Sequence, residues 1–192
     1  HAWVRGEKSK PFWVMQQQVG QTNWGEINPG IRPGTVRLWT WHAVANGAET
    51  VVYFRWRATR FAQESYQSGL LKHDGSLDMG YKEIENLLQE APVMQQLRDE
   101  PLSSPVAILT RFDDLWAIKI QPHRKDYDYL RTAFSYYRAL VELGISPDLV
   151  PYDADLSKYR LVIAPLMYIG DPDIIARLEA YVARGGSLLL GP

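Results

Sequence analysis

Short apolar segments alternate along this chain with longer stretches in which apolar residues recur every three or four positions. The clearest short segments cover residues 12–15, 50–56, 106–109 and 161–164. Short runs rich in β-branched and aromatic residues are typical of buried strands, and the longer stretches are typical of amphipathic helices. Because a chain that alternates strands and helices folds into a parallel sheet covered by helices, we predict an α/β protein.

The first half of the chain predicts two strand–helix units. The predicted elements are a strand at 12–15, a helix opened by Pro33 and stopped at Asn46 and Gly47, a strand at 50–56, a loop at 57–79 and a helix at 80–97. Proline suits the first turn of a helix, and glycine suits the position after its end. A loop as long as 57–79 is usually functional. Two such units are a quarter of a (β/α)8 TIM barrel, so we expect the first half to be part of a larger barrel.

Pro101 and Pro105 bracket a short serine-containing segment, which is typical of a domain boundary. We therefore predict one domain at 1–100 and a second at 101–192. The second domain is expected to contain strands at 106–109, 149–150, 161–164 and 187–190, with helices at 127–143 and 171–183. This order favours a doubly wound parallel sheet. Because the sequence stops directly after a strand, we expect the second domain to be incomplete at its C-terminus.

The composition argues against several classes of function. The chain has 21 basic and 22 acidic residues and no basic block, so no nucleic-acid partner and no anionic membrane surface is expected. It has no cysteine, which excludes disulfides, a thiol nucleophile and cysteine zinc sites. The apolar run at 161–167 is too short to span a bilayer, and the first residues lack the apolar core of a signal peptide. A cytoplasmic location is the default expectation.

The four histidines do not have the spacing of a metal site. They are His1, His42, His73 and His123. Metal-binding histidines usually recur at short, regular separations or beside other ligands. We therefore expect neither a metal nor another cofactor.

A polar loop that ends on a tryptophan follows the first predicted strand. The segment from Phe12 to Trp24 reads FWVMQQQVGQTNW. In a parallel barrel the carboxyl ends of all strands face one rim, so residues just after Met15 and just after Trp56 can converge there. Glu64 is the carboxylate that we expect on these rim segments. Gln16, which directly follows Met15, has an amide side chain and no carboxylate.

The segment from Phe12 to Trp24 closely resembles the nucleophile strand of family 42 glycoside hydrolases, the microbial β-galactosidases, whose pattern is roughly F-W-V-M-E-Q-Q-P-G-x-x-N-W. Gln16 stands where that family has its nucleophilic glutamate. Residues 53–71 resemble the last barrel strand and loop of the family. The resemblance implies that Glu64 hydrogen-bonds galactose hydroxyls, that Gln67 replaces an assisting histidine, and that Trp24 packs against the sugar.

The second half is similar to the trimerisation domain of the same family. The matching stretches are 106–109, 116–117, 136–140, 159–165 and 178–188. The resemblance implies a flavodoxin-like or class I glutamine-amidotransferase-like fold and a homotrimer. The segment has neither a nucleophile elbow nor a cysteine, which excludes amidotransferase chemistry.

The acid/base glutamate of the family lies upstream of the nucleophile strand, and we expect this chain to begin after it. Glu26 and Glu49 lack its context and are expected at the surface. We therefore predict a C-terminal fragment of a β-galactosidase. The intact parent would remove terminal β-D-galactosyl residues with retention, and this chain alone would be inactive.

A second reading is a non-catalytic galactoside-binding or oligomerisation protein derived from such enzymes. Gln16 favours that alternative, whereas Trp24 and Glu64 favour at least sugar binding. Gln67, and Val19 in place of the usual proline, favour natural divergence over an engineered Gln16. An unrelated flavodoxin-like binding domain would leave the first hundred residues unexplained.

Overall fold

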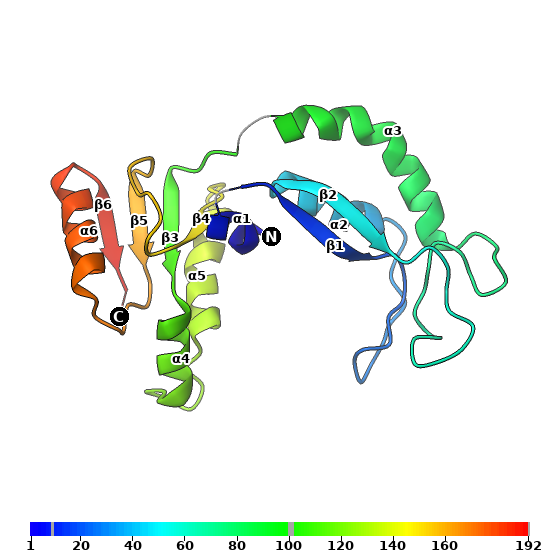
Figure 1. The fold of residues 1–192 in the computed structure, drawn as a ribbon, viewed down its shortest axis with the longest axis horizontal. Coiled ribbons are helices and arrows are strands. Elements are labelled where there is room, and N and C mark those ends of the chain that lie inside the picture. Colours follow the sequence, from blue (N-terminus) through cyan, green and yellow to red (C-terminus); the bar gives the residue numbers. More distant parts are fainter. Residues whose placement is uncertain (9, 100–101, 192) are drawn as a thin grey trace. The chain divides into compact units, whose positions relative to one another are not determined.

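The computed structural model describes residues 1–8, 10–99 and 102–191. It divides into two compact units, coloured by sequence in Figure 1. The first unit contains His1 and Pro11–Leu102, and the second contains Ala2–Lys10 and Ser103–Pro192. Residues Ala2–Lys10 thus belong to the second unit. The single boundary predicted near residue 100 assigns them to the first domain instead.

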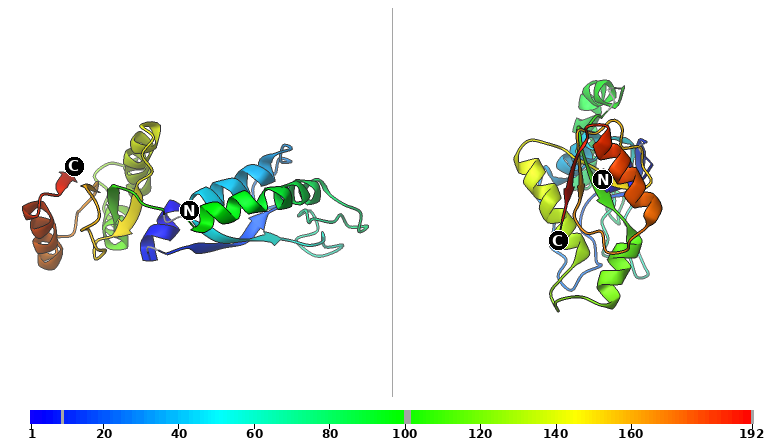
Figure 2. Two further views of the ribbon diagram at one scale, coloured as in Figure 1. Left: turned by 90° about the horizontal axis from the view of Figure 1, so that it is seen from above. Right: turned by 90° about the vertical axis from the view of Figure 1, so that its left-hand side faces the viewer.

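The first unit is built from two parallel strands and two helices. They are β1 (Phe12–Gln18), α2 (Thr35–Ala45), β2 (Ala48–Phe54) and α3 (Met79–Asp99). One face of the strand pair packs on α2, where Phe12, Ala43 and Ala48 form a small core. Helices α2 and α3 lie side by side, as Figure 2 shows. The order β1, α2, β2, α3 confirms the expected strand–helix alternation of an α/β protein.

The first helix–strand connection follows the predicted glycine chemistry. Gly47 has φ of 92°, a left-handed conformation that residues with a side chain rarely adopt. It follows Asn46, whose amide donates to the carbonyl oxygens of the last turn of α2. The chain therefore reverses within two residues, and β2 starts at Ala48, two residues before the predicted strand.

Strand β1 contains a bulge at its carboxyl end. Val14 pairs with Val51, but the next pair is Gln17 with Tyr53. Met15 and Gln16 therefore lie opposite the single residue Val52. A bulge of this kind changes the direction in which a side chain points and is frequent next to active sites.

The second unit contains a four-stranded sheet and four helices among its described residues. The helices are α1 (Ala2–Lys8), α4 (Phe112–Ile120), α5 (Tyr129–Glu142) and α6 (Pro172–Ala183). The strands are β3 (Val106–Thr110), β4 (Asp148–Pro151), β5 (Leu161–Ala164) and β6 (Ser187–Leu190). All pairings are parallel, in the order β4-β3-β5-β6.

Successive residues of β3 pack into two different cores. Ala107 and Leu109 join a cluster that includes Leu178 of α6. Val106 and Ile108 join another cluster, with Leu140 of α5 and Ala2 of α1. Because neighbouring residues of a strand point to opposite faces, helices cover both faces of this sheet.

Helix α4 was absent from the predicted elements. It buries Asp114 and exposes Phe112 and Trp116, which are 52% and 54% exposed. It also buries Ile118 and exposes Asp113, so neither face is consistently apolar and hydrophobic periodicity gives no clear signal here. Helix α1 was missed as well, because it has only seven residues and contains Gly6.

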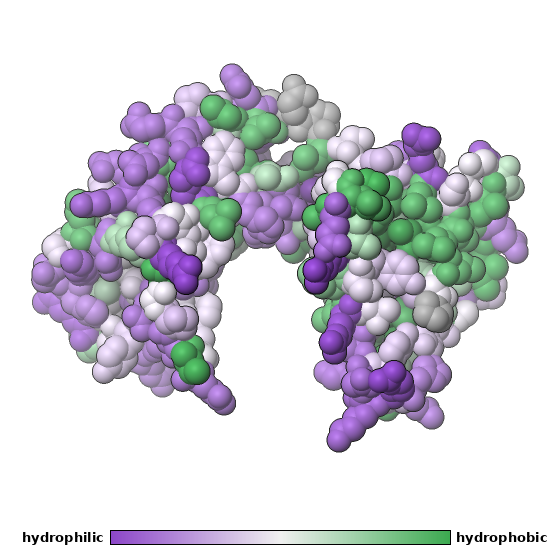
Figure 3. All heavy atoms as spheres, turned by 180° about the vertical axis from the view of Figure 1, so that it is seen from behind, coloured by the Kyte–Doolittle hydropathy of each residue, from purple (hydrophilic) through white to green (hydrophobic). Residues whose placement is uncertain are grey.

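Apolar side chains are exposed on the second unit. Leu189 and Leu190 of β6 are 46% and 55% exposed. Figure 3 shows hydrophobic residues gathered on this unit, whereas the visible face of the first unit is mostly hydrophilic. Large exposed apolar patches often mark contact surfaces. Across the described part of the chain, no helix combines the length and the apolar character needed to cross a membrane.

Candidate functional site

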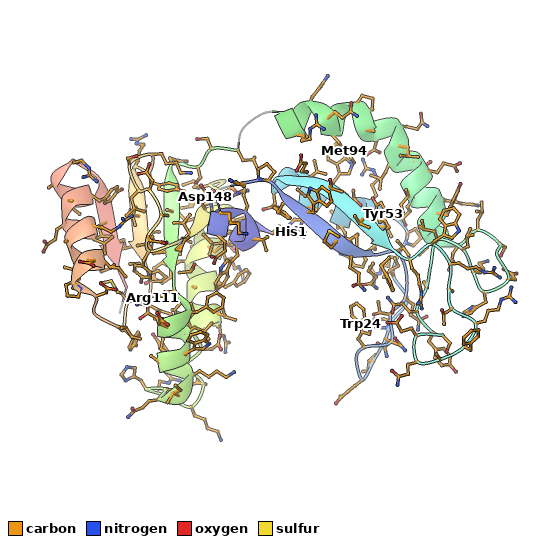
Figure 4. The ribbon with its side chains drawn as sticks, viewed as in Figure 1. His1, Trp24, Tyr53, Met94, Arg111 and Asp148 are labelled. Atoms are coloured by element: carbon orange, nitrogen blue, oxygen red, sulfur yellow. The ribbon has the colours of Figure 1, made fainter. Side chains whose placement is uncertain are left out.

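The four candidate residues lie on β1 and on the loops that follow β1 and β2. Gln16 is exposed in the bulge of β1. Trp24, on the next loop, is 67% exposed and is labelled in Figure 4. Glu64 and Gln67 lie on the loop between β2 and α3; Glu64 is exposed, and Gln67 is buried at 2% exposure. The expected surface acids Glu26 and Glu49 are both exposed.

Hydrogen bonds join the two loops directly. The amide of Gln21 donates to Oγ of Ser68 over 3.0 Å, and the amide of Ser68 donates to the carbonyl of Gln21 over 2.9 Å. Nδ2 of Asn23 donates to the carbonyl of Gln63 over 2.7 Å. Gly20 permits this approach, since a Cβ there would lie 2.4 Å from Cβ of Ser68. The loop of Trp24 and the loop of Glu64 thus form one surface at the carboxyl ends of two parallel strands.

The guanidinium of Arg55 holds Glu64 at two points. Nη1 donates to Oε2 of the carboxylate over 2.9 Å, and Nη2 donates to the main-chain carbonyl of Glu64 over 2.6 Å. The Arg55 side chain is 16% exposed and that of Glu64 is 49% exposed. A charge-assisted pair that also grips the main chain fixes the direction of the carboxylate.

A second arginine and a histidine tie the same loop together. Nη2 of Arg57 donates to the carbonyl of His73 over 2.6 Å. Nε2 of His73 lies 2.6 Å from the carbonyl of Ser65. The sequence did not point to these residues, because their partners depend on the path of the loop and not on any local spacing.

Gln67 differs from the other candidates because it is enclosed. Its amide nitrogen in the main chain donates to the carbonyl of Glu64 over 3.0 Å. Its side-chain Oε1 is buried and has no hydrogen-bond partner within the described residues. Buried polar atoms are normally paired, so this oxygen is available to a ligand hydroxyl or an ordered water.

A small hollow lies beside the joined loops. It has a volume of about 170 Å³, and its lining includes Gly20, Gln21, Ser68 and Asp78. Pockets for small-molecule ligands usually measure about 300–1,000 Å³. The hollow is therefore too small for a sugar chain, and the candidate residues lie outside its lining.

Tyr53 connects the strand pair to helix α2. Its hydroxyl lies 2.9 Å from Oγ1 of Thr40, a buried residue of that helix. Burial raises the pKa of the Tyr53 hydroxyl above its ordinary value. Tyr53, labelled in Figure 4, therefore stays protonated and acts as an anchor for β2.

The chemical capacity of these residues is limited by Gln16. A carboxamide cannot act as the carboxylate nucleophile of a retaining glycosidase. Glu64 is a fixed, half-exposed acceptor for hydrogen bonds, and Trp24 offers an exposed ring. Within the described residues, no group of three or more His, Cys, Asp and Glu side chains is arranged to hold a metal ion.

Parallel strands that alternate with helices, with polar loops joined at the carboxyl ends of β1 and β2, define an α/β protein. The family model described as β-galactosidase, of glycoside hydrolase family 42, matches residues 1–93. The model described as β-galactosidase trimerisation domain matches residues 104–192. The chain belongs to the family 42 β-galactosidases, which confirms the resemblance noted in the sequence.

Individual relatives agree with this membership. The chain is 41% identical over 192 residues to a β-galactosidase of Halorubrum lacusprofundi and 38% identical over 193 residues to one of Thermus thermophilus. All of the chain is matched in both cases, but only 27% and 29% of the relatives. The chain therefore spans under a third of the length of these relatives.

Solved structures show the same relationship. The β-galactosidase of Halorubrum lacusprofundi superimposes with a TM-score of 0.89 at 40% identity, covering 100% of this chain and 28% of that one. The β-galactosidase of the psychrophilic Marinomonas ef1 gives 0.88 at 38% identity, covering 94% and 28%. The fold described above is thus shared with part of each of these enzymes.

Proposed function

We propose that this chain corresponds to the last part of the catalytic TIM barrel and the trimerisation domain of a β-galactosidase. In the intact parent, the enzyme removes terminal non-reducing β-D-galactosyl residues with retention of configuration. Gln16 occupies the nucleophile position, and Trp24, Glu64 and Gln67 hold the terminal galactose. The domains of the proposal are 1–100 and 101–192.

The observation that carries this proposal is the junction of the two loops. Retention requires a nucleophile and the groups that hold the sugar to meet at one rim. The bonds between Gln21 and Ser68, and between Asn23 and Gln63, bring the loop of Trp24 against the loop of Glu64. The bulge that displays Gln16 lies at the same end of β1.

Position 16 supports the proposal that this chain alone does not hydrolyse galactosides. An amide oxygen is neutral and far less nucleophilic than a carboxylate, so no glycosyl–enzyme intermediate forms at Gln16. Among the described residues, we assign the acid/base role of the family to no glutamate, and we propose that this group lies on an earlier strand of the intact parent.

Residues 101–192 are proposed to assemble a homotrimer. The matching family model is described as a trimerisation domain, and Leu189 and Leu190 are exposed apolar residues in this region. The strand order β4-β3-β5-β6 corresponds to the first four positions of a flavodoxin-like, doubly wound sheet, which supports the proposed fold of this domain.

The cytoplasmic location stays a prediction, to be checked by fractionation of the source cells.

A covalent-trapping experiment tests the galactosidase proposal. The Gln16→Glu variant is incubated with 2-deoxy-2-fluoro-β-D-galactosyl fluoride, and the intact mass is measured. The introduced carboxylate attacks the anomeric carbon while fluoride leaves, so this step needs no acid catalyst. We expect one galactosyl adduct on Gln16→Glu and none on the unchanged chain. The absence of adduct on both proteins would contradict the proposed site.

A second candidate function is galactoside binding without catalysis, which Gln16 favours because it preserves the shape of a glutamate while removing its charge. To compare the two candidates, the unchanged chain is titrated with galactose and binding is monitored by NMR. An assay with an aryl β-galactoside measures turnover in parallel. Because both candidates leave Gln16 unable to act as a nucleophile, binding without turnover supports the second candidate when Gln16→Glu also forms no adduct. Glucose, which differs at one hydroxyl, is the matched control ligand.

A further inference from the structure

Three consecutive main-chain carbonyls around Glu64 each accept a hydrogen bond from a side chain of a different segment. Asn23, on the loop after β1, donates to the carbonyl of Gln63 over 2.7 Å. Arg55, at the end of β2, donates to the carbonyl of Glu64 over 2.6 Å. His73, further along the same loop, donates to the carbonyl of Ser65 over 2.6 Å. Because a carbonyl oxygen only accepts, Nε2 of His73 must carry a hydrogen.

The carboxylate of Glu64 is constrained as well as its main chain. Arg55 engages Oε2 over 2.9 Å, and the side chain is still 49% exposed. Among the described contacts, none involves the other carboxylate oxygen. One oxygen is therefore held by the protein, and the half-exposed carboxylate keeps capacity to accept a hydrogen bond from a hydroxyl group.

We propose that Asn23, Arg55 and His73 form a clamp that positions Glu64 for sugar binding. The inference rests on the proposed function, since it assigns the purpose of the clamp to the sugar-binding role of Glu64. The three clamp residues do not touch the sugar themselves. They determine where the Glu64 carboxylate stands before the ligand arrives.

The clamp is needed because the loop between β2 and α3 has little other regular structure. Its residues from 55 to 78 include two isolated bridges but no helix or strand among the described positions. Ala62, two residues before Glu64, has φ of 73°, a conformation unfavourable for a residue with a side chain. A loop that is ordered before binding loses less conformational entropy when the ligand binds. Ordering the loop therefore raises the affinity for the ligand.

The test measures galactose affinity in variants of the chain by NMR titration. Arg55→Met removes both bonds to Glu64, and His73→Phe removes the bond to Ser65. We expect the dissociation constant for galactose to rise about tenfold for each, the effect of losing one good hydrogen bond. Arg55→Lys keeps the charge with fewer donors and should recover part of the loss. Arg60→Met, at an exposed arginine of the same loop, is the matched control and should change nothing.

A double-mutant cycle distinguishes positioning from general stabilisation. If the clamp acts through the Glu64 side chain, then Arg55→Met causes no further loss of affinity in the Glu64→Ala background, which has no carboxylate left to position. A merely structural arginine would weaken binding equally in both backgrounds. An equal loss would therefore overturn the proposal, as would a normal galactose affinity in Arg55→Met and His73→Phe.

Hydrogen exchange separates failure of the clamp from failure of the proposed function. Clamp substitutions should raise the exchange rates of the amides of residues 63–67 at least about tenfold, because these amides lose their fixed geometry. If galactose does not bind the unchanged chain but exchange rises as expected, the sugar site is wrong, and the role assigned to the clamp in sugar binding is overturned with it. If galactose binds and exchange is unchanged, the clamp alone is wrong.

Discussion

Nη2 of Arg5 lies 2.8 Å from Oδ1 of Asp148, a residue 143 positions later in the chain. Both side chains are almost fully enclosed, with 11% and 10% exposure. Tyr159 donates its hydroxyl to the second oxygen, Oδ2, over 2.9 Å, so both carboxylate oxygens are paired. This network joins helix α1 to strand β4 within the second unit. Helix α1 precedes β1, the strand that contains Gln16.

Removing Arg5 should strongly destabilise the second unit. The Arg5→Met variant removes the buried partner of Asp148 and leaves the half-exposed Lys158, 3.8 Å from Oδ2, as the remaining nearby cation. Breaking a buried pair typically costs about 3–5 kcal/mol. Urea unfolding followed by circular dichroism measures the change. Arg138→Met is the control, since Arg138 pairs with Glu142 at 2.7 Å on an exposed helix face. Its cost should be about 0.3–0.5 kcal/mol. Equal costs for both variants would show that the Arg5 pair is not a stabilising anchor.

Gly6 should tolerate no side chain where α1 packs on β4. A Cβ at this position would lie 1.6 Å from the carbonyl oxygen of Leu149, a backbone atom that cannot move away on its own. Gly6→Ala should therefore displace α1 and lower stability by about 1–3 kcal/mol or more. Thermal unfolding and amide exchange in residues 2–8 report the change. Gly170→Ala is the control, because nothing lies within 4 Å of a Cβ there. An unchanged melting temperature in Gly6→Ala would contradict the close packing.

Asp114 should be essential to the connection after β5. It is completely buried, and its Oδ1 accepts the amides of Tyr168 and Ile169 over 2.9 Å and 2.8 Å. Asp114→Ala leaves these amides unpaired at about 1–3 kcal/mol each, whereas Asp114→Asn keeps an acceptor oxygen and should cost less. Chemical unfolding provides the measurement, with Asp113→Ala as the control because Asp113 is half exposed. If Asp114→Asn proved as damaging as Asp114→Ala, the charge and not the acceptor would be the important property.

Buried tyrosines should make the second unit sensitive to alkali. Burial raises the pKa values of Tyr152, Tyr159 and Tyr181, which share one core cluster. Since the unfolded tyrosine pKa is about 10, the protonated hydroxyls stabilise the folded state fully below that pH. This stability is lost as the pH rises above 10 and through the higher folded-state values.

The Tyr152→Phe variant tests this dependence most cleanly. The buried hydroxyl of Tyr152 has no hydrogen-bond partner among the described residues, so its removal should cost little at pH 7. Unfolding free energies measured between pH 8 and pH 11 should fall less steeply in this variant. Tyr66→Phe, at a residue that is 78% exposed, should leave the slope unchanged. A slope identical in Tyr152→Phe and the unchanged chain would exclude Tyr152 as a source of the alkaline loss.

Local chemistry explains why most elements were predictable. The apolar runs of β1, β3 and β5 and the amphipathic pattern of α5 are visible without any long-range information. Gly47, Gly144 and Gly185 all have positive φ and lie two residues after a helix. A single glycine in the sequence therefore indicates the end of each of these helices. Asp171 and Pro172 likewise mark the start of α6, where Asp171 accepts the amide of Asp173 over 3.0 Å.

The candidate site was predictable only in part, through its resemblance to a family. The motif placed Gln16, Trp24 and Glu64 on strand ends and loops, where the structure has them. It did not indicate the bulge at Gln16 or the enclosure of Gln67. Strand register and the route of a long loop depend on neighbouring segments, which no local pattern encodes.

The sequence by itself determined the alternation of strands and helices, most helix ends, the family and the amide at position 16. These properties follow from residues near one another in the chain. Only the tertiary structure decided that α1 joins the second unit, that α4 buries Asp114 and exposes Trp116, and that Arg55 holds Glu64. Each depends on partners brought together by folding, because burial and pairing with distant groups override local hydrophobic periodicity.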